Sequence, residues 1–191
     1  ESGGANLNYA TDVFVDGARS FANQARLSAH GIPQVTVVHG NATAGGAYQP
    51  GLSDYVIMVR GKTKMFLAGP PLVKAATGED ATDEELGGAE LHTEVVGSAE
   101  YLAEDDADGI RIARSVMERM PWNEQLPLRE ARAYEEPLFS PDELLGVVPT
   151  DSKTAYDVRE IIARIADGSE FLAFKQAWDG QTVCGQISIW G

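Results

Sequence analysis

A glycine pair set between two strand-like runs constrains this chain more than any other feature. Gly45 and Gly46 lie within Thr43–Gly51. The β-branched run Gln34–Val38 precedes this segment, and the apolar run Tyr55–Val59 follows it. Backbone can approach a ligand closely at such a pair, because no Cβ intervenes. If a helix begins there, its first N–H groups lack helical partners and can hold an anion or a developing oxyanion. The pattern therefore predicts a strand–turn–helix unit with a backbone anion site at its turn.

Strands and helices alternate through residue 120, which favours a layered α/β domain. The second apolar run has no polar residue after its tyrosine, as expected of a strand covered on both faces. A helix over Asp105–Met120 is predicted by acids in its first turn and by apolar residues at helical spacing, namely Ile110, Ala113, Met117 and Met120. The other predicted elements are a strand over Lys64–Leu67 and helices from an Asp16 cap to about His30, over Pro70–Thr77 and over Thr82–Leu86.

The amino-acid composition changes after residue 120. Five prolines fall within 121–150, so we expect this segment to be a connector between two domains. Beyond it, 151–191 contains a predicted helix over Tyr156–Ala166 and a hairpin around Asp179-Gly180. The chain opens without methionine and ends in a strand-like run, so we expect a fragment of a longer polypeptide.

Charge and cysteine content narrow the functional classes. The formal net charge is −14, which argues against a nucleic-acid surface because phosphate binding needs a positive field. A single cysteine, Cys184, excludes an internal disulfide framework and suits a reducing compartment. No apolar run approaches the roughly 20 residues that a membrane span needs.

Several familiar sites are absent. Leu52 stands where the lysine of a phosphate loop would follow Gly46 and Gly51. The chain has no G-x-G-x-x-G after a strand and no G-x-S-x-G nucleophile elbow. The histidines show no ligand-like spacing, so we expect no metal site. For Cys184 we expect a small buried residue, and for His92 a hydrogen-bonded structural role.

One segment departs from the acidic background. Tyr55–Gly78 has no acid but contains Arg60, Lys62, Lys64 and Lys74. These cations could bind the phosphate groups of a carrier such as coenzyme A. The alternative, which we favour for each single residue, is an edge strand protected by lysines.

The remaining site chemistry is mostly backbone. Glycine turns at Gly3-Gly4 and Gly45-Gly46 converge on an oxyanion site without an obvious side-chain nucleophile. That combination suits enolate chemistry on a thioester, where the work is to stabilise charge on a carbonyl oxygen. Replacing Gly46 with a bulky β-branched residue is expected to abolish such chemistry without unfolding the protein.

Several motifs occur in order along essentially the whole chain: Ser2–Leu7, Ala44–Tyr48, Phe66–Glu79, Leu86–Thr93, Tyr156–Ile165 and Asp167–Ser169. Together they resemble one family, the carboxyltransferase (β) subunits of biotin-dependent acyl-CoA carboxylases. The branch acting on methylcrotonyl-CoA and geranyl-CoA is the most similar. Asn41-Ala42 and Gln49 depart from the methylcrotonyl pattern, which leaves geranyl-CoA or another acyl-CoA open.

The resemblance implies a crotonase-like (ClpP/crotonase) fold of stacked ββα units. It implies that 1–120 is part of an N-terminal acyl-CoA-binding domain and that 151–191 begins a C-terminal domain. Gly45 and Gly46 would be the catalytic amides, and the substrate-binding residues would be Ser2, Gly3, Gly4, Ala44, Ala47 and Tyr48.

The same resemblance implies a cofactor, partners and a compartment. Carboxybiotin, carried by a partner, would supply CO2, and no metal is implied in this chain. A biotin carboxylase/biotin carrier subunit and further copies of this subunit would assemble with it. The location would be the bacterial cytoplasm or the mitochondrial matrix. Alternatives are a biotin-dependent decarboxylase of the same fold, a non-catalytic scaffold and, remotely, a serine peptidase of ClpP type.

Overall fold

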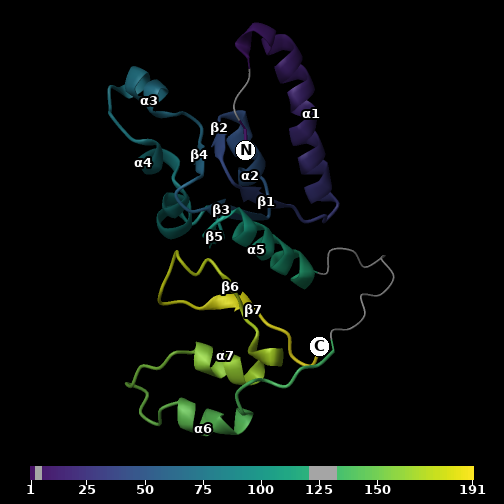
Figure 1. The fold of residues 1–191 in the computed structure, drawn as a ribbon, viewed down its shortest axis with the longest axis vertical. Coiled ribbons are helices and arrows are strands. Elements are labelled where there is room, and N and C mark those ends of the chain that lie inside the picture. Colours follow the sequence, from purple (N-terminus) through teal and green to yellow (C-terminus); the bar gives the residue numbers. More distant parts are fainter. Residues whose placement is uncertain (3–5, 121–132) are drawn as a thin grey trace. The chain divides into compact units, whose positions relative to one another are not determined.

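The computed structural model describes residues 1, 2, 6–120 and 133–191, which divide between two compact units. The first unit is Glu1–Asn123 and the second is Glu124–Gly191. Each has its own strands and helices (Figure 1). In the first unit these are η1 (Leu7–Tyr9), α1 (Ala10–Ala29), β1 (Val35–Val38), β2 (Asn41–Thr43), α2 (Gly45–Gly51), β3 (Tyr55–Val59), β4 (Lys64–Phe66), α3 (Pro70–Thr77), α4 (Asp83–Gly87), η2 (Leu91–Val96), β5 (Tyr101–Ala103) and α5 (Asp106–Arg119).

Two parallel sheets organise the first unit. Strands β1, β3 and β5 form one sheet in that order, and β2 and β4 form the other. The chain runs strand, strand, helix twice, as β1–β2–α2 and β3–β4–α3. The first strand of each repeat joins the larger sheet and the second strand joins the smaller one. This arrangement confirms the predicted stacked ββα units.

The core of the first unit lies on the larger sheet. Ile57, Met58 and Val59 on β3 are almost wholly buried, as predicted for a strand covered on both faces. Helix α5 packs on this sheet, and its Gly109 comes so close that an added Cβ would lie 3.0 Å from Val37 Cγ1. The buried face of α5 differs from the apolar positions whose spacing predicted the helix. Gly109, Ile112 and Val116 are buried, whereas Ile110 is 51% exposed.

Helix α1 begins earlier than the sequence suggested. An Asp16 cap was expected, but Asp16 lies inside the helix. The chain turns at Asn6, whose side-chain oxygen accepts from the Asn8 amide at 3.1 Å and whose carbonyl accepts from the Tyr9 amide at 3.0 Å. No residue of α1, all of which are described, is fully buried.

Local capping explains the helices that were predicted accurately. Pro70 begins α3, where its missing N–H costs nothing, and Gly78 ends it in the left-handed conformation. Thr82 and Glu85 form the predicted capping box at the start of α4. The Thr82 hydrogen bonds hold the pKa of Glu85 below its usual value.

The second unit combines short helices with a hairpin (Figure 1). Arg164, only 8% exposed, donates hydrogen bonds to Glu143 and Glu160, and so joins the short helical turn that ends at Glu143 to the helix that contains Glu160. The predicted connector 121–150 therefore has its described end folded with this unit, while 121–132 lies outside the described residues. The elements are η3 (Pro141–Glu143), α6 (Leu144–Val147), α7 (Arg159–Ile165), η4 (Asp167–Ser169), β6 (Leu172–Phe174) and β7 (Cys184–Gln186).

Two expectations for the second unit need adjustment. Helix α7 starts at Arg159, whose amide donates to Asp157 Oδ1 at 2.9 Å, so it is shorter than the predicted Tyr156–Ala166. Strands β6 and β7 pair antiparallel, as expected of a hairpin, but they are only three residues each. Asp179 accepts from the Gln181 amide at 2.9 Å and so shapes the longer loop between them.

Candidate active site

The predicted strand–turn–helix unit is present at the glycine pair. Strand β2 ends at Thr43, and α2 begins at Gly45, so Ala44 alone separates them. Ala44 has φ 52° and ψ −118°, a left-handed backbone that L residues rarely adopt. Its amide donates to Phe66 O on β4 at 3.1 Å, and its carbonyl accepts from the Ala47 amide at 3.0 Å. The turn is thus fixed by bonds on both of its sides.

The amides of Gly45 and Gly46 are the donors left over at this turn. Within the part of the chain that the structure describes, no group accepts a hydrogen bond from either amide. Both belong to the first turn of α2, where helical N–H groups lack helical partners. Two adjacent donors of this kind can stabilise negative charge on one oxygen atom. This is the chemistry that the sequence predicted for the pair.

The two glycines differ in how much room they leave for a side chain. An added Cβ at Gly46 would lie 2.2 Å from Ser2 Oγ and 2.3 Å from Ser2 Cβ, so Ser2 packs directly on this glycine. Ser2 is held there because its amide donates to Asn41 O at 2.7 Å, beside β2. A Cβ at Gly45 would be 3.9 Å from Phe21 Cζ, an ordinary contact. A bulky side chain at Gly46 would therefore disturb the packing around Ser2, a cost that the expectation of a folded variant did not include.

A hollow of about 490 Å³ lies between the glycine turn and α1. Ser2, Ala44, Gly45 and Gly46, all predicted site residues, line it. Ala47 is buried behind the turn instead, and Tyr48 is 53% exposed with its ring edge-on to Phe21 at 6.2 Å. Gly3 and Gly4 lie outside the described residues. The hollow's other lining residues are Val13, Phe14, Gly17, Ala18, Ser20, Phe21, Thr43 and Gln49.

The α1 wall of this hollow was not predicted as part of the site. Ala18 and Phe21 belong to a stripe of small and apolar residues on α1 (with Ala22, Ala25 and Ala29), a pattern that by sequence alone suits close packing against a sheet. Gly17 lies in mid-helix and has no atom within 4 Å of an added Cβ. A glycine inside a helix is unfavourable, so Gly17 was the one feature of the sequence that could have indicated a special role for this face of α1.

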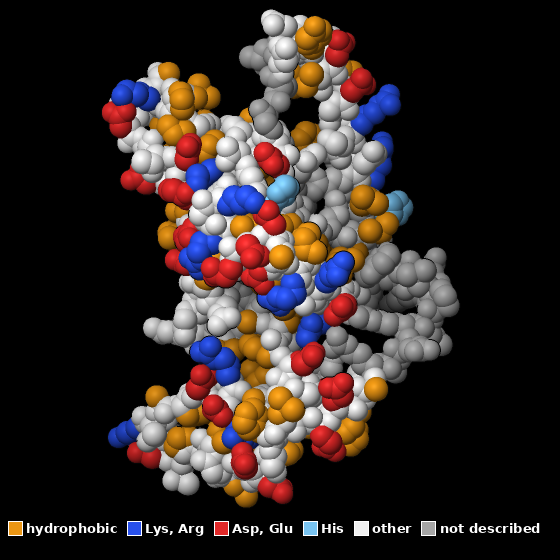
Figure 2. Space-filling model, viewed as in Figure 1, with side chains coloured by type: hydrophobic (Ala, Val, Ile, Leu, Met, Phe, Trp, Pro, Cys, Tyr) orange, Lys and Arg blue, Asp and Glu red, His pale blue; other side chains and the backbone are white. Residues whose placement is uncertain are grey.

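The basic segment is neutralised by carboxylates. Arg60 contacts Glu90 and Glu104, and Lys62 contacts Asp106 at 2.5 Å. The hydrogen bond from Lys62 lowers the pKa of Asp106. The remaining pairs are Lys64–Glu84 and Lys74–Asp80. Figure 2 shows the two signs of charge interspersed on this face of the first unit. Each of these cations is therefore paired with a carboxylate, which does not favour an open phosphate site. The edge-strand alternative fits Lys64 alone, because β3 is the central strand of its sheet and Lys74 lies on α3.

The prediction for His92 is confirmed, and the prediction for Cys184 is wrong. His92 has the predicted structural role, since its Nε2 lies 2.7 Å from Met65 O and its Nδ1 lies 2.6 Å from Ser98 Oγ. Cys184 was expected to be buried but is exposed, because β7 belongs to a two-stranded sheet and its residues are all exposed.

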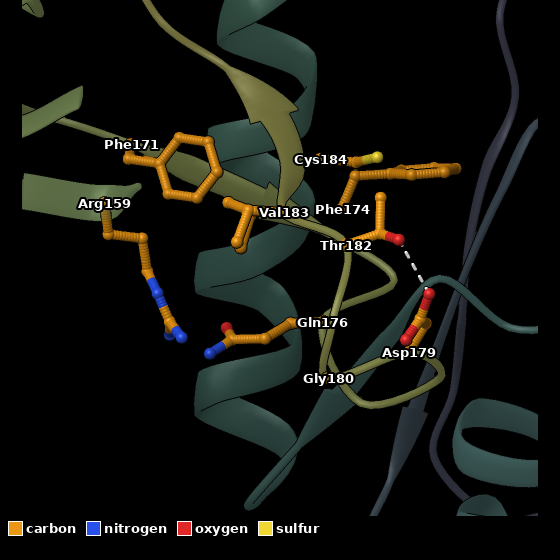
Figure 3. A pocket seen from close by; sticks show the side chains of 10 residues that line it. Arg159, Phe171, Phe174, Gln176, Asp179, Gly180, Thr182, Val183 and Cys184 are labelled. Carbon is orange, nitrogen blue, oxygen red and sulfur yellow. Dashed lines mark hydrogen bonds between the residues drawn. The ribbon is translucent and has the colours of Figure 1, made fainter. Parts of the chain in front are cut away.

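A second hollow of about 230 Å³ lies in the hairpin of the second unit, with Cys184 on its rim (Figure 3). Arg159 and Gln176 extend toward it from α7 and from the loop after β6. Asp179, also on its lining, is occupied by the hydroxyl of Thr182 at 2.8 Å. The described side chains gather no three His, Cys, Asp or Glu in the way a metal ion requires. Among the described helices, none has the length and apolar character of a membrane span.

The fold and the turn define the class to which this chain belongs. Stacked ββα units with backbone amides at an apolar hollow are the arrangement of a crotonase-like protein. Residues 1–191 match the carboxyl transferase domain family, and the chain belongs to that family.

Similar proteins extend this result. The probable biotin-dependent acyl-coenzyme A carboxylase beta2 subunit of Mycobacterium tuberculosis is 49% identical over the whole chain, which covers 36% of that protein. The solved P. aeruginosa geranyl-CoA carboxylase beta subunit is 70% identical, with a TM-score of 0.59 over 98% of this chain and 35% of that one. The transcarboxylase 12S crystal structure is 35% identical, with a TM-score of 0.84 over 97% of this chain and 36% of that one. The chain thus spans about a third of the length of these relatives.

Proposed function

We propose that the protein containing this chain is the carboxyltransferase component of a biotin-dependent acyl-CoA carboxylase. The observation that carries the proposal is the Gly45-Gly46 turn, with two amides that no described group satisfies, set at an apolar hollow. Its family membership and its likeness to acyl-CoA carboxylase subunits support the same activity.

The proposed role of the turn is to bind the thioester carbonyl. When the substrate loses a proton, negative charge gathers on that oxygen and the amides of Gly45 and Gly46 stabilise it. Removing one donor of this kind costs about 3–4 kcal/mol in a measured case from another enzyme. Carboxybiotin, when bound, supplies CO2 and a ureido nitrogen that accepts the substrate proton. The electron pair of the enolate then forms the new bond to CO2, so this chain needs no side-chain base.

The residues described here fit the acyl-CoA half of the reaction. Carbonyl binding needs backbone donors beside apolar surface, and the turn and the α1 wall offer both. We assign 1–120 to the acyl-CoA-binding domain and 151–191 to the start of a second domain that completes the site for biotin. The partners we propose are a biotin carboxylase/biotin carrier subunit and further copies of this subunit. The bacterial cytoplasm or mitochondrial matrix stays the expected location.

We further propose a branched, unsaturated acyl group such as geranyl as the preferred substrate. The hollow beside the turn is large, and Val13, Phe14 and Phe21 give it an apolar lining. The 70% identity to a geranyl-CoA carboxylase subunit supports this choice over methylcrotonyl-CoA. Of the alternative functions, a decarboxylase would use the same turn for the reverse reaction. A non-catalytic scaffold would need the amides of Gly45 and Gly46 to be covered.

The full-length subunit, reconstituted with its biotin-bearing partner, tests the proposal. Labelled bicarbonate and ATP would be supplied with geranyl-, methylcrotonyl-, propionyl- or acetyl-CoA, and label in the acyl-CoA product would be counted. We expect transfer to geranyl-CoA with the highest kcat/KM, and a large loss of transfer in Gly45→Ala. Failure to carboxylate any acyl-CoA would overturn the function. Preference for a short acyl group would overturn the substrate alone.

A further inference from the structure

His92 joins two parts of the first unit through its ring. The carbonyl of Met65 can only accept, so the proton of the neutral ring lies on Nε2, which donates to Met65 O at 2.7 Å. Nδ1 is then an acceptor, and the Ser98 hydroxyl donates to it at 2.6 Å. Both ring nitrogens are therefore engaged, and the ring orientation is fixed.

The strand that His92 contacts is the one that holds the glycine turn. Successive carbonyls of a strand face opposite edges. On β4, Phe66 O faces β2 and accepts the amide of Ala44 at 3.1 Å, while Met65 O faces the other edge and accepts from His92. Gly87 also approaches that edge, since an added Cβ would lie 2.3 Å from Met65 O. A single strand thus separates the imidazole from the residue that precedes Gly45.

The backbone of His92 is tied to the larger sheet. Its carbonyl accepts from the Ala99 amide at 3.2 Å, and the next amide, that of Glu100, donates to Val56 O on β3 at 2.9 Å. The smaller sheet has only two strands of three residues each, too few to be stable alone. His92 therefore links this small sheet to the core of the unit.

We propose that His92 is a positioning residue for the reaction. It fixes the outer edge of β4, and through the β4–Ala44 bond it holds the amides of Gly45 and Gly46 in the direction that the thioester oxygen requires. This inference rests on the proposed function of the turn. A displacement of about 1 Å from a distant change can cost about 100-fold in rate, so a small shift of these amides suffices to affect turnover.

Four variants of the full-length subunit test this role. His92→Ala removes both hydrogen bonds. His92→Gln keeps a donor for Met65 O and an acceptor for Ser98, whereas His92→Asn is too short to span both. Thr93→Val is the matched control. It removes a buried hydrogen bond from the same helical segment, Thr93 Oγ1 to Ala89 O at 2.9 Å, without touching β4.

The expected results separate positioning from general stability. Hydrogen exchange of the bonded amides at this turn, those of Ala44 and Ala47, should rise in His92→Ala and His92→Asn, but not in His92→Gln or Thr93→Val. Carboxyl transfer should fall about tenfold or more in kcat, with KM within about twofold, in the first two variants and recover in His92→Gln. If His92→Ala does not fold, the comparison of Asn with Gln gives the same information.

The outcomes also separate this inference from the proposed function. Unchanged exchange at Ala44 and Ala47 in His92→Ala and His92→Asn would overturn the positioning role, whatever the activity. An equal loss of kcat in Thr93→Val would overturn it too, because lost stability alone would then explain the effect. A wild-type subunit that transfers no carboxyl group would instead overturn the proposed function, while the exchange result would still decide what His92 holds in place.

Discussion

The contact between Gly46 and Ser2 makes the sharpest prediction about this turn. In Gly46→Ala the new Cβ would lie 2.2 Å from Ser2 Oγ and 2.3 Å from Ser2 Cβ, more than 1 Å inside an ordinary contact. Rotation of the hydroxyl could move Ser2 Oγ away, but Ser2 Cβ is fixed to the main chain, so backbone must move. Overpacking of this kind typically costs about 1–3 kcal/mol. We therefore expect Gly46→Ala to lower the free energy of unfolding by that amount and to reduce carboxyl transfer.

A second substitution should restore what the first one removes. In Ser2→Gly/Gly46→Ala both clashing atoms are gone, and the next nearest atom is Ser2 Cα at 3.7 Å, an ordinary contact. The Ser2 amide keeps its bond to Asn41 O, because that bond uses backbone alone. The double variant should therefore recover most of the lost stability. The coupling free energy of the cycle should be about 1–3 kcal/mol, since the two residues share one contact.

The cycle is measured on four full-length proteins: wild type, each single variant and the double variant. Thermal or urea unfolding gives the free energy of unfolding of each protein, and transfer of a labelled carboxyl group gives its activity. Additive losses in the double variant would refute the reasoning, because the structure places the whole clash on the Ser2 side chain.

Three further predictions concern neighbouring groups. Gly45→Ala should leave stability nearly unchanged, since its Cβ meets only Phe21 Cζ at 3.9 Å. The variant keeps its amide, but the methyl enters the hollow that Phe21 lines, and displacing the substrate by about 1 Å would lower kcat by about 100-fold. Activity near wild type would contradict the oxyanion role. Gly17→Ala should raise the free energy of unfolding by about 0.5–1 kcal/mol, because it removes a mid-helix glycine with open space around it, and denaturation midpoints would check this. Burial, aided by nearby Tyr55 and Glu100, raises the pKa of Tyr101 to about 12. The folded state then keeps its proton longer than the unfolded one, so stability should be full below pH 10, fall between about pH 10 and 12, and fall less in Tyr101→Phe.

Local signals in the sequence were enough to predict the bounds of several strands and helices. Strand β3 was predicted to the residue, because an unbroken apolar run bounded by turns has few other uses. Helix α3 was predicted as well, because Pro70 and Gly78 mark its two ends by backbone preference alone. The start of α1 was missed because its N-cap residue, Tyr9, has no side chain that can cap a helix. The side chain that shapes the start is Asn6, which lies one turn before the first helical residue, Ala10.

Contacts between distant segments were beyond sequence reasoning. Arg60 pairs with Glu104, 44 residues away, so the basic segment could not be known to be neutralised. The sequence predicted the turn at the glycine pair, but the packing of Ser2 on Gly46 depends on a parallel bridge between Ser2 and Ala42. The α1 wall likewise depends on how the helix returns over the turn. The sequence was therefore sufficient to predict the strand–turn–helix geometry, whereas the groups that surround the turn come from the fold.

The number of donors at the turn follows from how a strand passes into a helix. Phe66 O takes the amide of Ala44, and Ala44 O takes the amide of Ala47. Only the amides of Gly45 and Gly46 lie between these bonds, so two donors remain among the described residues. The positive φ of Ala44 makes this possible, because it turns the chain within one residue. A longer linker would free more amides but hold none of them in a fixed direction, whereas preorganised donors are the ones that stabilise a developing charge.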